Sequence, residues 1–153
     1  NVIEVVTVNL YSLVESIFER QQAAVFIKEN TLLNLIENDF ELHTDENILR
    51  FILRNIIGNA IKFTTTGTIT IDAQKTEQSV VISIQDTGVG ITKEVIEKIM
   101  TTSNKYTSLG TNNEKGTGLG LVFVKDFIYL LKGKMWVESE VNKGTTFYIE
   151  LLN

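Results

Sequence analysis

The chain has no cysteine, no proline and a single histidine in 153 residues. Without cysteine, disulfides, zinc fingers, iron–sulfur clusters and thiol nucleophiles are excluded. No apolar run approaches the ~20 residues that span a bilayer, and Asn1 is followed by neither a basic region nor a cleavable apolar segment. We therefore expect a soluble segment. We also expect it to be part of a longer chain, because it starts without Met and directly on the apolar run 2–8.

The chain contains enough apolar material for one compact domain. Hydrophobic residues make up 43% and charged residues 22%, and a chain of about 150 residues buries roughly 68–70% of its unfolded surface. Residues 1–153 are therefore expected to form a single domain. Lys and Arg number 14 against 19 Asp and Glu, a net charge of −5. This charge opposes binding to nucleic acid or to an anionic membrane, so a bound phosphate has to be held by local contacts.

The order of apolar and polar residues predicts a mixture of helices and strands. Apolar residues spaced three and four apart predict helices over 10–18, 44–63, 92–100 and 119–131. Alternation predicts strands over 68–73, 79–85, 135–139 and 145–152, and weaker patterns favour strands over 2–8, 26–36 and 39–43. Thr44 is the expected N-cap of the second helix. These elements predict an α/β chain of the α+β two-layer sandwich type, with about three helices on one face of a mixed, mostly antiparallel sheet.

Three glycine-rich clusters interrupt this pattern: Asp-Thr-Gly-Val-Gly-Ile at 86–91, Gly-Thr-Gly-Leu-Gly-Leu at 116–121 and Lys-Gly-Thr-Thr at 143–146. The second cluster is not a dinucleotide fingerprint, which would need glycine at Leu121, and it is not a P-loop, because its lysine precedes its glycine. A glycine cluster that opens a helix still offers free backbone N–H groups and a positive dipole end to a phosphate chain. The alternative is two turns and a helix start.

Three polar residues share one face of the predicted helix 44–63. Asn55, Asn59 and Lys62 occupy positions i, i+4 and i+7. Amide oxygens suit Mg²⁺, which keeps several waters and shares phosphate oxygens, and a nearby lysine would neutralise phosphate charge. The alternative is a solvated polar face, although asparagine is a poor helix former and occurs twice in mid-helix here.

Asp86 ends a predicted strand just before two glycines. Its carboxylate can accept a hydrogen bond from an amine, while Gly88 and Gly90 allow a flat ring to approach the backbone. Taken alone, Asp86 is better interpreted as an ordinary Asp-Gly turn residue. Its significance depends on the clusters that surround it.

In this order, the clusters resemble the catalytic and ATP-binding domain of sensor histidine kinases, within the Bergerat-fold superfamily that also includes gyrase-type ATPases. Asn-Ile-Ile-Gly-Asn-Ala-Ile-Lys-Phe-Thr at 55–64 looks like the family's N-box, 86–91 like its first glycine box and 116–121 like its second. The run 143–147 resembles the small glycine turn before the last strand. The resemblance covers nearly the whole chain and implies a Bergerat-type fold with a long ATP lid over 101–117.

The resemblance implies a role for each matching residue, with ATP and Mg²⁺ as the ligands. Asp86 would bind the adenine amino group, and Asn59 would hold Mg²⁺ with Asn55 nearby. Lys62 would touch the phosphates, so that Asn55 and Lys62 are the expected catalytic residues. The other residues expected to bind ATP are Phe63, Gly88, Gly90, Ile91, Lys105, Lys115, Gly116, Thr117, Gly118, Leu119, Gly120 and Thr145.

The residue one helical turn before the magnesium asparagine helps to choose the reaction. ATP hydrolases of the superfamily carry there a glutamate that activates water, whereas this chain has Asn55. An amide cannot act as a general base at neutral pH. The resemblance therefore implies a protein-histidine kinase domain that donates the γ-phosphoryl group of Mg-ATP to a histidine.

The phosphate-accepting histidine of the family lies in a separate dimerisation hairpin, and His43 does not match its motif. We expect His43 to be a surface residue, and the chain to be a monomeric module that binds ATP without phosphorylating itself. The implied partners are that hairpin and, indirectly, a response regulator. The implied location is cytoplasmic, in a parent protein that can be membrane-anchored.

Two alternatives keep the fold but change the function. Met100 and Thr101 stand where the family has aromatic or apolar anchors, which favours a degenerate nucleotide-sensing or protein-interaction module. The intact Asn59, Asp86 and glycine clusters oppose that alternative. The other is a stand-alone serine kinase or slow ATPase of the same superfamily, which predicts phosphoserine on a partner or steady release of phosphate.

Overall fold

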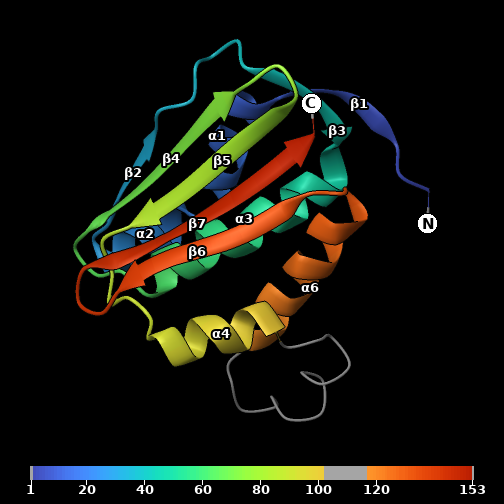
Figure 1. Ribbon diagram of the computed structural model, residues 1–153. Coiled ribbons are helices and arrows are strands. Elements are labelled where there is room, and N and C mark those ends of the chain that lie inside the picture. Colours follow the sequence, from blue (N-terminus) through green and yellow to red (C-terminus); the bar gives the residue numbers. More distant parts are fainter. Residues whose placement is uncertain (1, 102–116, 153) are drawn as a thin grey trace.

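The computed structural model describes residues 2–101 and 117–152, with 117–119 described by their backbone alone (Figure 1). Its elements are β1 (Val5–Asn9), α1 (Leu10–Arg20), α2 (Gln22–Lys28), β2 (Thr31–Asn34), β3 (Glu41–Asp45), α3 (Glu46–Lys62), β4 (Thr68–Lys75), β5 (Ser79–Asp86), α4 (Lys93–Thr101), α6 (Thr117–Leu130), β6 (Lys134–Glu140) and β7 (Gly144–Leu152). Within the described ranges, no helix has both the length and the apolar character needed to cross a bilayer.

The main sheet has five strands in the order β2-β4-β5-β7-β6 (Figure 1). β2 runs parallel to β4, and the other neighbouring pairs are antiparallel. β1 and β3 form a separate two-stranded antiparallel ribbon. Lys75, at the end of β4, connects the sheet to the start of β3. Its ammonium lies 5.3 Å from the ring centroid of Phe40 and donates to the Glu41 carbonyl at 2.6 Å.

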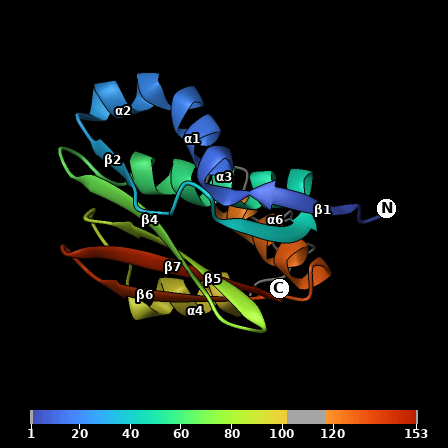
Figure 2. The same ribbon diagram turned by 90° about the horizontal axis from the view of Figure 1, so that it is seen from above.

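α3 is the central helix of the apolar layer, because its inward face is almost completely removed from water. The residues of that face with 0% exposure are Leu49, Ile52, Leu53, Ile56 and Ile57. Figure 2 shows α1, α2 and α3 on the same side of the five-stranded sheet. Strands β4, β5 and β7 alternate buried apolar residues with more exposed ones, as a sheet with one covered face requires. The predicted two-layer sandwich is confirmed.

The prediction of a strand over 26–36 is wrong for the first part of that range. α2 occupies its first residues, Glu29 then adopts a left-handed φ of 57°, and only Thr31–Asn34 forms a strand. The apolar pair that favoured a strand is exposed, Phe26 at 83% and Ile27 at 76%. Consecutive apolar residues have no period of their own, and single exposed apolar side chains are common on helices.

The predicted start of α3 is also wrong by one residue. Thr44 is not the N-cap, because it pairs with Val6 as part of β3. Asp45 is the N-cap instead: its Oδ1 accepts a hydrogen bond from Ile48 N at 3.0 Å. Its Oδ2 accepts from Glu4 N at 2.9 Å, and this bond above all lowers the pKa of Asp45. One carboxylate therefore fixes both the ribbon and the central helix.

Candidate functional site

A cavity of about 250 Å³ lies beside the C-terminal half of α3. Its polar side chains are Asn59 from α3, Asp86 from β5 and Thr145 from β7. Its apolar walls come from α3, α4, α6 and β7, with Ala60, Phe63, Val95, Ile99, Leu121 and Phe147. A mostly apolar cavity with a few convergent polar groups is the usual form of a small-molecule site.

Asp86 is held rigidly in the wall of this cavity. It is the last residue of β5, where it pairs with Thr145 of β7, and it is 8% exposed. Its Oδ1 accepts two backbone hydrogen bonds, from Gly88 N at 2.9 Å and from Thr145 N at 3.2 Å. Its Oδ2 makes no hydrogen bond within 2–101 and 117–152. The carboxylate is thus oriented through one oxygen, and the other remains available to a ligand.

Burial sets the electrostatics of Asp86. Removal from water raises the pKa of its carboxyl, and the N–H donors of Gly88 and Thr145 lower it by less. The hydrogen bonds that the protein supplies therefore do not fully offset the cost of burying the Asp86 carboxylate. A ligand that brings a hydrogen-bond donor to Oδ2 would supply one.

The loop 87–91 between β5 and α4 forms one rim of the cavity and is fastened on both sides. Val89 N donates to the Phe63 carbonyl at 3.2 Å, which ties the loop to the end of α3. Ile91 N donates to Ser139 Oγ at 2.8 Å, which ties it to β6. The predicted ligand residue Ile91 therefore lines the cavity from a loop whose backbone is fixed.

Gly88 and Gly90 allow this loop to pack closely on its neighbours. A Cβ at Gly88 would overlap the Phe63 carbonyl and lie 2.6 Å from Thr64 Oγ1. Gly90 has a φ of 74°, and a Cβ there would overlap the Glu140 carbonyl. The sequence suggested that these glycines make room for a ring. The structure shows that each absent side chain would collide with protein backbone, and the role of these glycines in admitting a ring stays a prediction.

The structure brings only part of the polar face of α3 to the cavity. Asn59 lines it, and its side chain makes no hydrogen bond with the described residues. Asn55 lies one turn away and is not in the wall; its Nδ2 donates to the Phe51 carbonyl at 2.8 Å. Lys62 is exposed, with its ammonium 5.4 Å from the ring centroid of Phe63. Asn59, Phe63 and Asp86 therefore share one cavity, flanked by the other two residues.

The second glycine cluster meets α3 at the start of α6. Thr117, Gly118 and Leu119 belong to the first turn of α6. A Cβ at Gly120 would lie 2.8 Å from Asn55 Oδ1, so the two helices approach closely there. The other predicted ligands of this region, Lys105, Lys115 and Gly116, lie outside the described residues, as does 102–116 of the predicted lid.

Part of the site was not predicted from the sequence. Val95 and Ile99 line the cavity from α4. Lys125 on α6 donates from Nζ to the carbonyls of Ile99 at 3.1 Å and Met100 at 2.6 Å. The amphipathic pattern of α4 contained the signal for its two wall residues. The partners of Lys125 are backbone atoms about 25 residues away, which leave no pattern in the sequence.

The single histidine lies outside this site. His43 is an exposed residue of β3, and its Nδ1 is 3.2 Å from Thr7 Oγ1. Its exposure agrees with the predicted surface position.

Comparison with known proteins identifies the family. A family model described as histidine kinase-, DNA gyrase B-, and HSP90-like ATPase matches residues 44–153. Sensor histidine kinase WalK of Bacillus subtilis is 33% identical over 149 residues, which cover 94% of this chain and 24% of WalK. Autoinducer 2 sensor kinase/phosphatase LuxQ of Vibrio vulnificus is 39% identical over 124 residues, which cover 77% of this chain and 14% of LuxQ.

A solved structure agrees with the sequence relatives. The catalytic domain of histidine kinase ThkA superposes with a TM-score of 0.82 at 26% identity, over 97% of this chain and 95% of that one. The chain therefore belongs to the histidine kinase-, DNA gyrase B-, and HSP90-like ATPase family. Within it, the chain is an ATP-binding domain of the sensor histidine kinase type. It spans 24% of the length of WalK and 14% of that of LuxQ.

Proposed function

We propose that the chain binds Mg-ATP and donates the γ-phosphoryl group to a histidine on a separate dimerisation hairpin of the same kinase. The observation that carries the proposal is Asp86, a buried carboxylate with one oxygen anchored by two N–H groups and the other without a partner in the described chain. An apolar cavity with one free, fixed acceptor is complementary to a flat heterocycle that carries an exocyclic amine. Adenine is such a heterocycle.

The phosphate side of the proposal rests on α3 and α6. Asn59 lines the cavity, and its amide oxygen would serve as an Mg²⁺ ligand, with Asn55 one turn away. Bound Mg²⁺ would offset phosphate charge and align the phosphate oxygens. Lys62, on the same helix, would contact the phosphates. The backbone N–H groups of 117–120 at the start of α6 suit a phosphate chain.

Asn55 favours phosphoryl transfer over hydrolysis. Its Nδ2 already donates to the Phe51 carbonyl, and an amide has no basic atom that can take a proton from water. In the proposed reaction the bond between the γ-phosphorus and its bridging oxygen breaks, a phosphorus–nitrogen bond forms, ADP leaves and the histidine loses its N–H proton. The chain would contribute positioning and charge neutralisation.

The proposed partners follow from the missing acceptor. His43 lies on β3, outside the cavity wall, so the accepting histidine would come from the dimerisation hairpin and would later pass its phosphoryl group to a response regulator. The chain 1–153 would act as a single monomeric unit in the cytoplasm. It would bind nucleotide without phosphorylating itself.

Calorimetric titration of adenosine and of ATP, with and without Mg²⁺, tests the adenine site. Asp86→Asn keeps Oδ1 for the two N–H donors but replaces Oδ2 by an NH₂ donor, which would face the donor amine of adenine. We expect this change to weaken both ligands by about 10- to 100-fold, because a hydrogen bond to a charged group is lost. Burial raises the pKa of Asp86, so wild-type affinity should also fall as the pH is lowered towards that pKa.

Asp72→Asn is the matched control. Asp72 lies in the middle of β4, outside the cavity wall, and its Oδ1 accepts from the N–H of Ala73 at 2.8 Å. Its replacement should leave both affinities within about twofold. Equal binding by wild type and Asp86→Asn, or no binding by folded wild type, would contradict the proposed adenine site.

The reaction is tested separately by adding a matched hairpin protein in trans with labelled ATP. Phosphohistidine on the hairpin is the expected product. Phosphoserine on a partner, or steady release of phosphate by the chain alone, would instead indicate one of the other reactions of the superfamily.

A further inference from the structure

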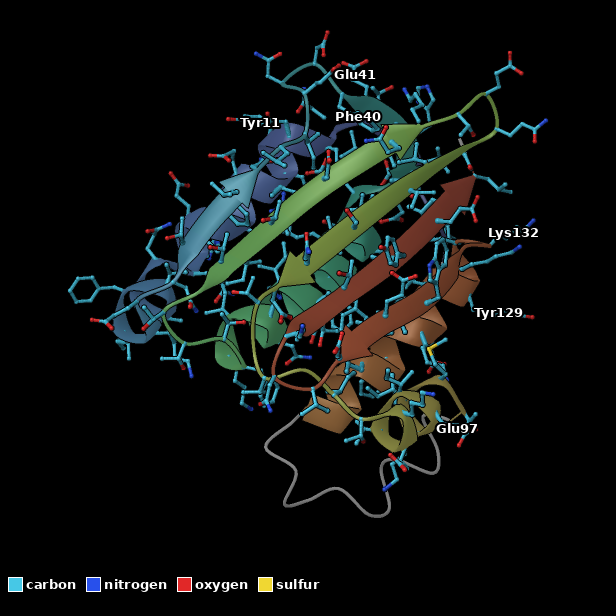
Figure 3. The ribbon with its side chains drawn as sticks, turned by 60° about the vertical axis from the view of Figure 1, so that its left-hand side comes forward. Tyr11, Phe40, Glu41, Glu97, Tyr129 and Lys132 are labelled. Carbon is cyan, nitrogen blue, oxygen red and sulfur yellow. The ribbon has the colours of Figure 1, made fainter. Side chains whose placement is uncertain are left out.

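α4 forms part of the cavity wall although it is weakly attached to the rest of the fold. None of its nine residues, all of which the structure describes, is buried. It nevertheless supplies Val95 and Ile99 to the cavity. Its outer side carries Glu97, which points away from the fold, as does Tyr129 on α6 (Figure 3). Ile99 and Met100 pack against the core but are only partly buried. A wall with so little buried surface opens easily unless a further interaction holds it.

Lys125 provides such an interaction from α6. Its Nζ donates to the Ile99 carbonyl at 3.1 Å and to the Met100 carbonyl at 2.6 Å. Both carbonyls belong to the last turn of α4, where helical C=O groups lack partners within the helix and carry partial negative charge. An ammonium at this point satisfies two acceptors and complements the helix dipole. It also reaches the backbone of Ile99, whose side chain forms the cavity wall.

The position of Lys125 is unfavourable for a charge. The residue is half-buried, and burial lowers the pKa of its ammonium, while neighbouring Asp126 raises it by less. Leu121, Val124 and Ile128 of the same helix are almost completely buried, at 3%, 0% and 2% exposure. An apolar side chain would fit this surrounding at a lower desolvation cost. The ammonium donates hydrogen bonds to the carbonyls of α4, which a methionine of similar length could not do.

We propose that Lys125 is a positioning residue of the nucleotide site, which holds the C-terminal turn of α4 against α6 so that Ile99 and Val95 form the wall of the adenine cavity. This inference rests on the proposed adenine site. Lys125 would support binding of the adenine ring indirectly, through α4, and would not act on the phosphates.

The test compares four versions of the whole chain: wild type, Lys125→Met, Lys125→Arg and the control Lys132→Met. Methionine keeps the length and apolar stem of lysine but cannot donate, whereas arginine can donate to both carbonyls. Lys132 is exposed just after α6 and points to solvent (Figure 3). Two quantities are measured: hydrogen exchange of the α4 and α3 amides without nucleotide, and the affinities for adenosine and for Mg-ATP.

We expect Lys125→Met to raise exchange of the α4 amides about tenfold and to leave α3 unchanged, because two hydrogen bonds from a charged group are lost. Adenosine and Mg-ATP should both weaken, by the same factor of about three to ten, since both use the wall that α4 forms. Lys125→Arg should be close to wild type both in the exchange of the α4 amides and in the two affinities. Lys132→Met should match wild type in every measurement.

Each other outcome overturns the inference. Weaker binding of Mg-ATP with unchanged adenosine would mean that Lys125 acts on the phosphates. Unchanged exchange in α4, faster exchange in α3 and α4 together, or a Lys125→Met chain that does not fold would contradict a role confined to α4. The proposed adenine site is judged separately, because it fails if wild type binds neither ligand, whatever the exchange of α4 shows.

Discussion

α3 and α4 line the same cavity but are held in the fold in different ways. α3 buries seven apolar residues, and its N-terminus is capped by the buried Asp45. α4 buries none: its Ile99 and Met100 pack against the core while only partly buried. Hydrogen bonds to the exposed Thr92 and from the half-buried Lys125 hold its two ends. α3 therefore presents its cavity residues from a helix whose other face belongs to the hydrophobic core. α4 presents its cavity residues from a surface helix.

The difference teaches how stability and binding are divided in this domain. Loss of a buried α3 side chain removes core packing, which every other element shares. Loss of an α4 side chain removes cavity wall with little effect on the core. Regions that change shape around ligands are usually drawn from the less stable parts of a fold. The expected consequence is that substitutions in the two helices separate the free energy of unfolding from the affinity for adenosine.

Ile56→Ala and Ile99→Ala test this separation directly. Ile56 is 0% exposed, so its truncation should lower the free energy of unfolding by about 2–5 kcal/mol. Ile99 is only partly buried, so the same truncation should cost about 1 kcal/mol or less. Its contact with the cavity should make Ile99→Ala the variant with the larger loss of adenosine affinity per unit of stability lost. Urea unfolding and calorimetry measure the two quantities.

Equal losses of stability in the two variants would break the comparison. It would also fail if Ile99→Ala bound adenosine as tightly as wild type, because α4 would then line the cavity without contributing to the affinity for adenosine. The chain should still fold after either change, since one truncated side chain removes a small part of a core built from many elements.

Much of the α3 side of the site was predictable because its signals are local. The helix was expected over 44–63 from its apolar period, and the structure has it over Glu46–Lys62 with Phe63 as its C-cap. Asn59 on the helix and Phe63 at its end both line the cavity. The alternating strands placed Asp86 at the end of β5. Its pairing with Thr145 came from the fold as a whole, because β5 and β7 are far apart in the sequence.

The α4 side was less predictable because its interactions are not local. Lys125 and Asp126 form one charged pair of neighbours in a mostly apolar stretch of α6, and nothing in the local sequence indicates that Lys125 donates to carbonyls of α4. The N-cap error at Thr44 has a similar origin. Thr44 and Asp45 are both good N-cap residues, and the pairing of Thr44 with Val6 in the ribbon decides between them.

Asp45→Ala sharpens the contrast at the N-terminus of α3. The change removes the hydrogen bonds to Ile48 N and Glu4 N and should cost about 1–2 kcal/mol of the free energy of unfolding. These bonds lower the pKa of Asp45 in the folded state. The stability that they contribute is therefore present above the unfolded pKa and is lost as the pH falls through the lowered folded pKa. Asp45→Asn should keep much of the cap and lose this pH dependence.

Urea titrations at neutral pH and at about pH 3 measure this linkage. The difference between wild type and Asp45→Asn should shrink as the carboxyl of the wild type becomes protonated. A constant difference across that range would mean that Asp45 has the same pKa in the folded and unfolded chains. Adenosine affinity at neutral pH should stay unchanged in Asp45→Asn, because Asp45 is not part of the cavity.

The smallest expected effects come from the same substitution at the two helices, Thr64→Val after α3 and Thr92→Val before α4. Thr64 Oγ1 is buried and has no hydrogen-bond partner among residues 2–101 and 117–152, so exchanging it for a methyl group removes a desolvation cost that no hydrogen bond offsets. Thr92 Oγ1 accepts from Val95 N at 3.2 Å near the surface. We expect Thr64→Val to change the free energy of unfolding by less than about 0.5 kcal/mol or to raise it, and Thr92→Val to lower it by about 0.5–1 kcal/mol. A large loss in Thr64→Val would indicate that its hydroxyl bonds an ordered water in the core. The free energy of unfolding would then be more sensitive to the change at Thr64 than to the change at Thr92. The end of α3 would depend on a polar contact, as α4 does.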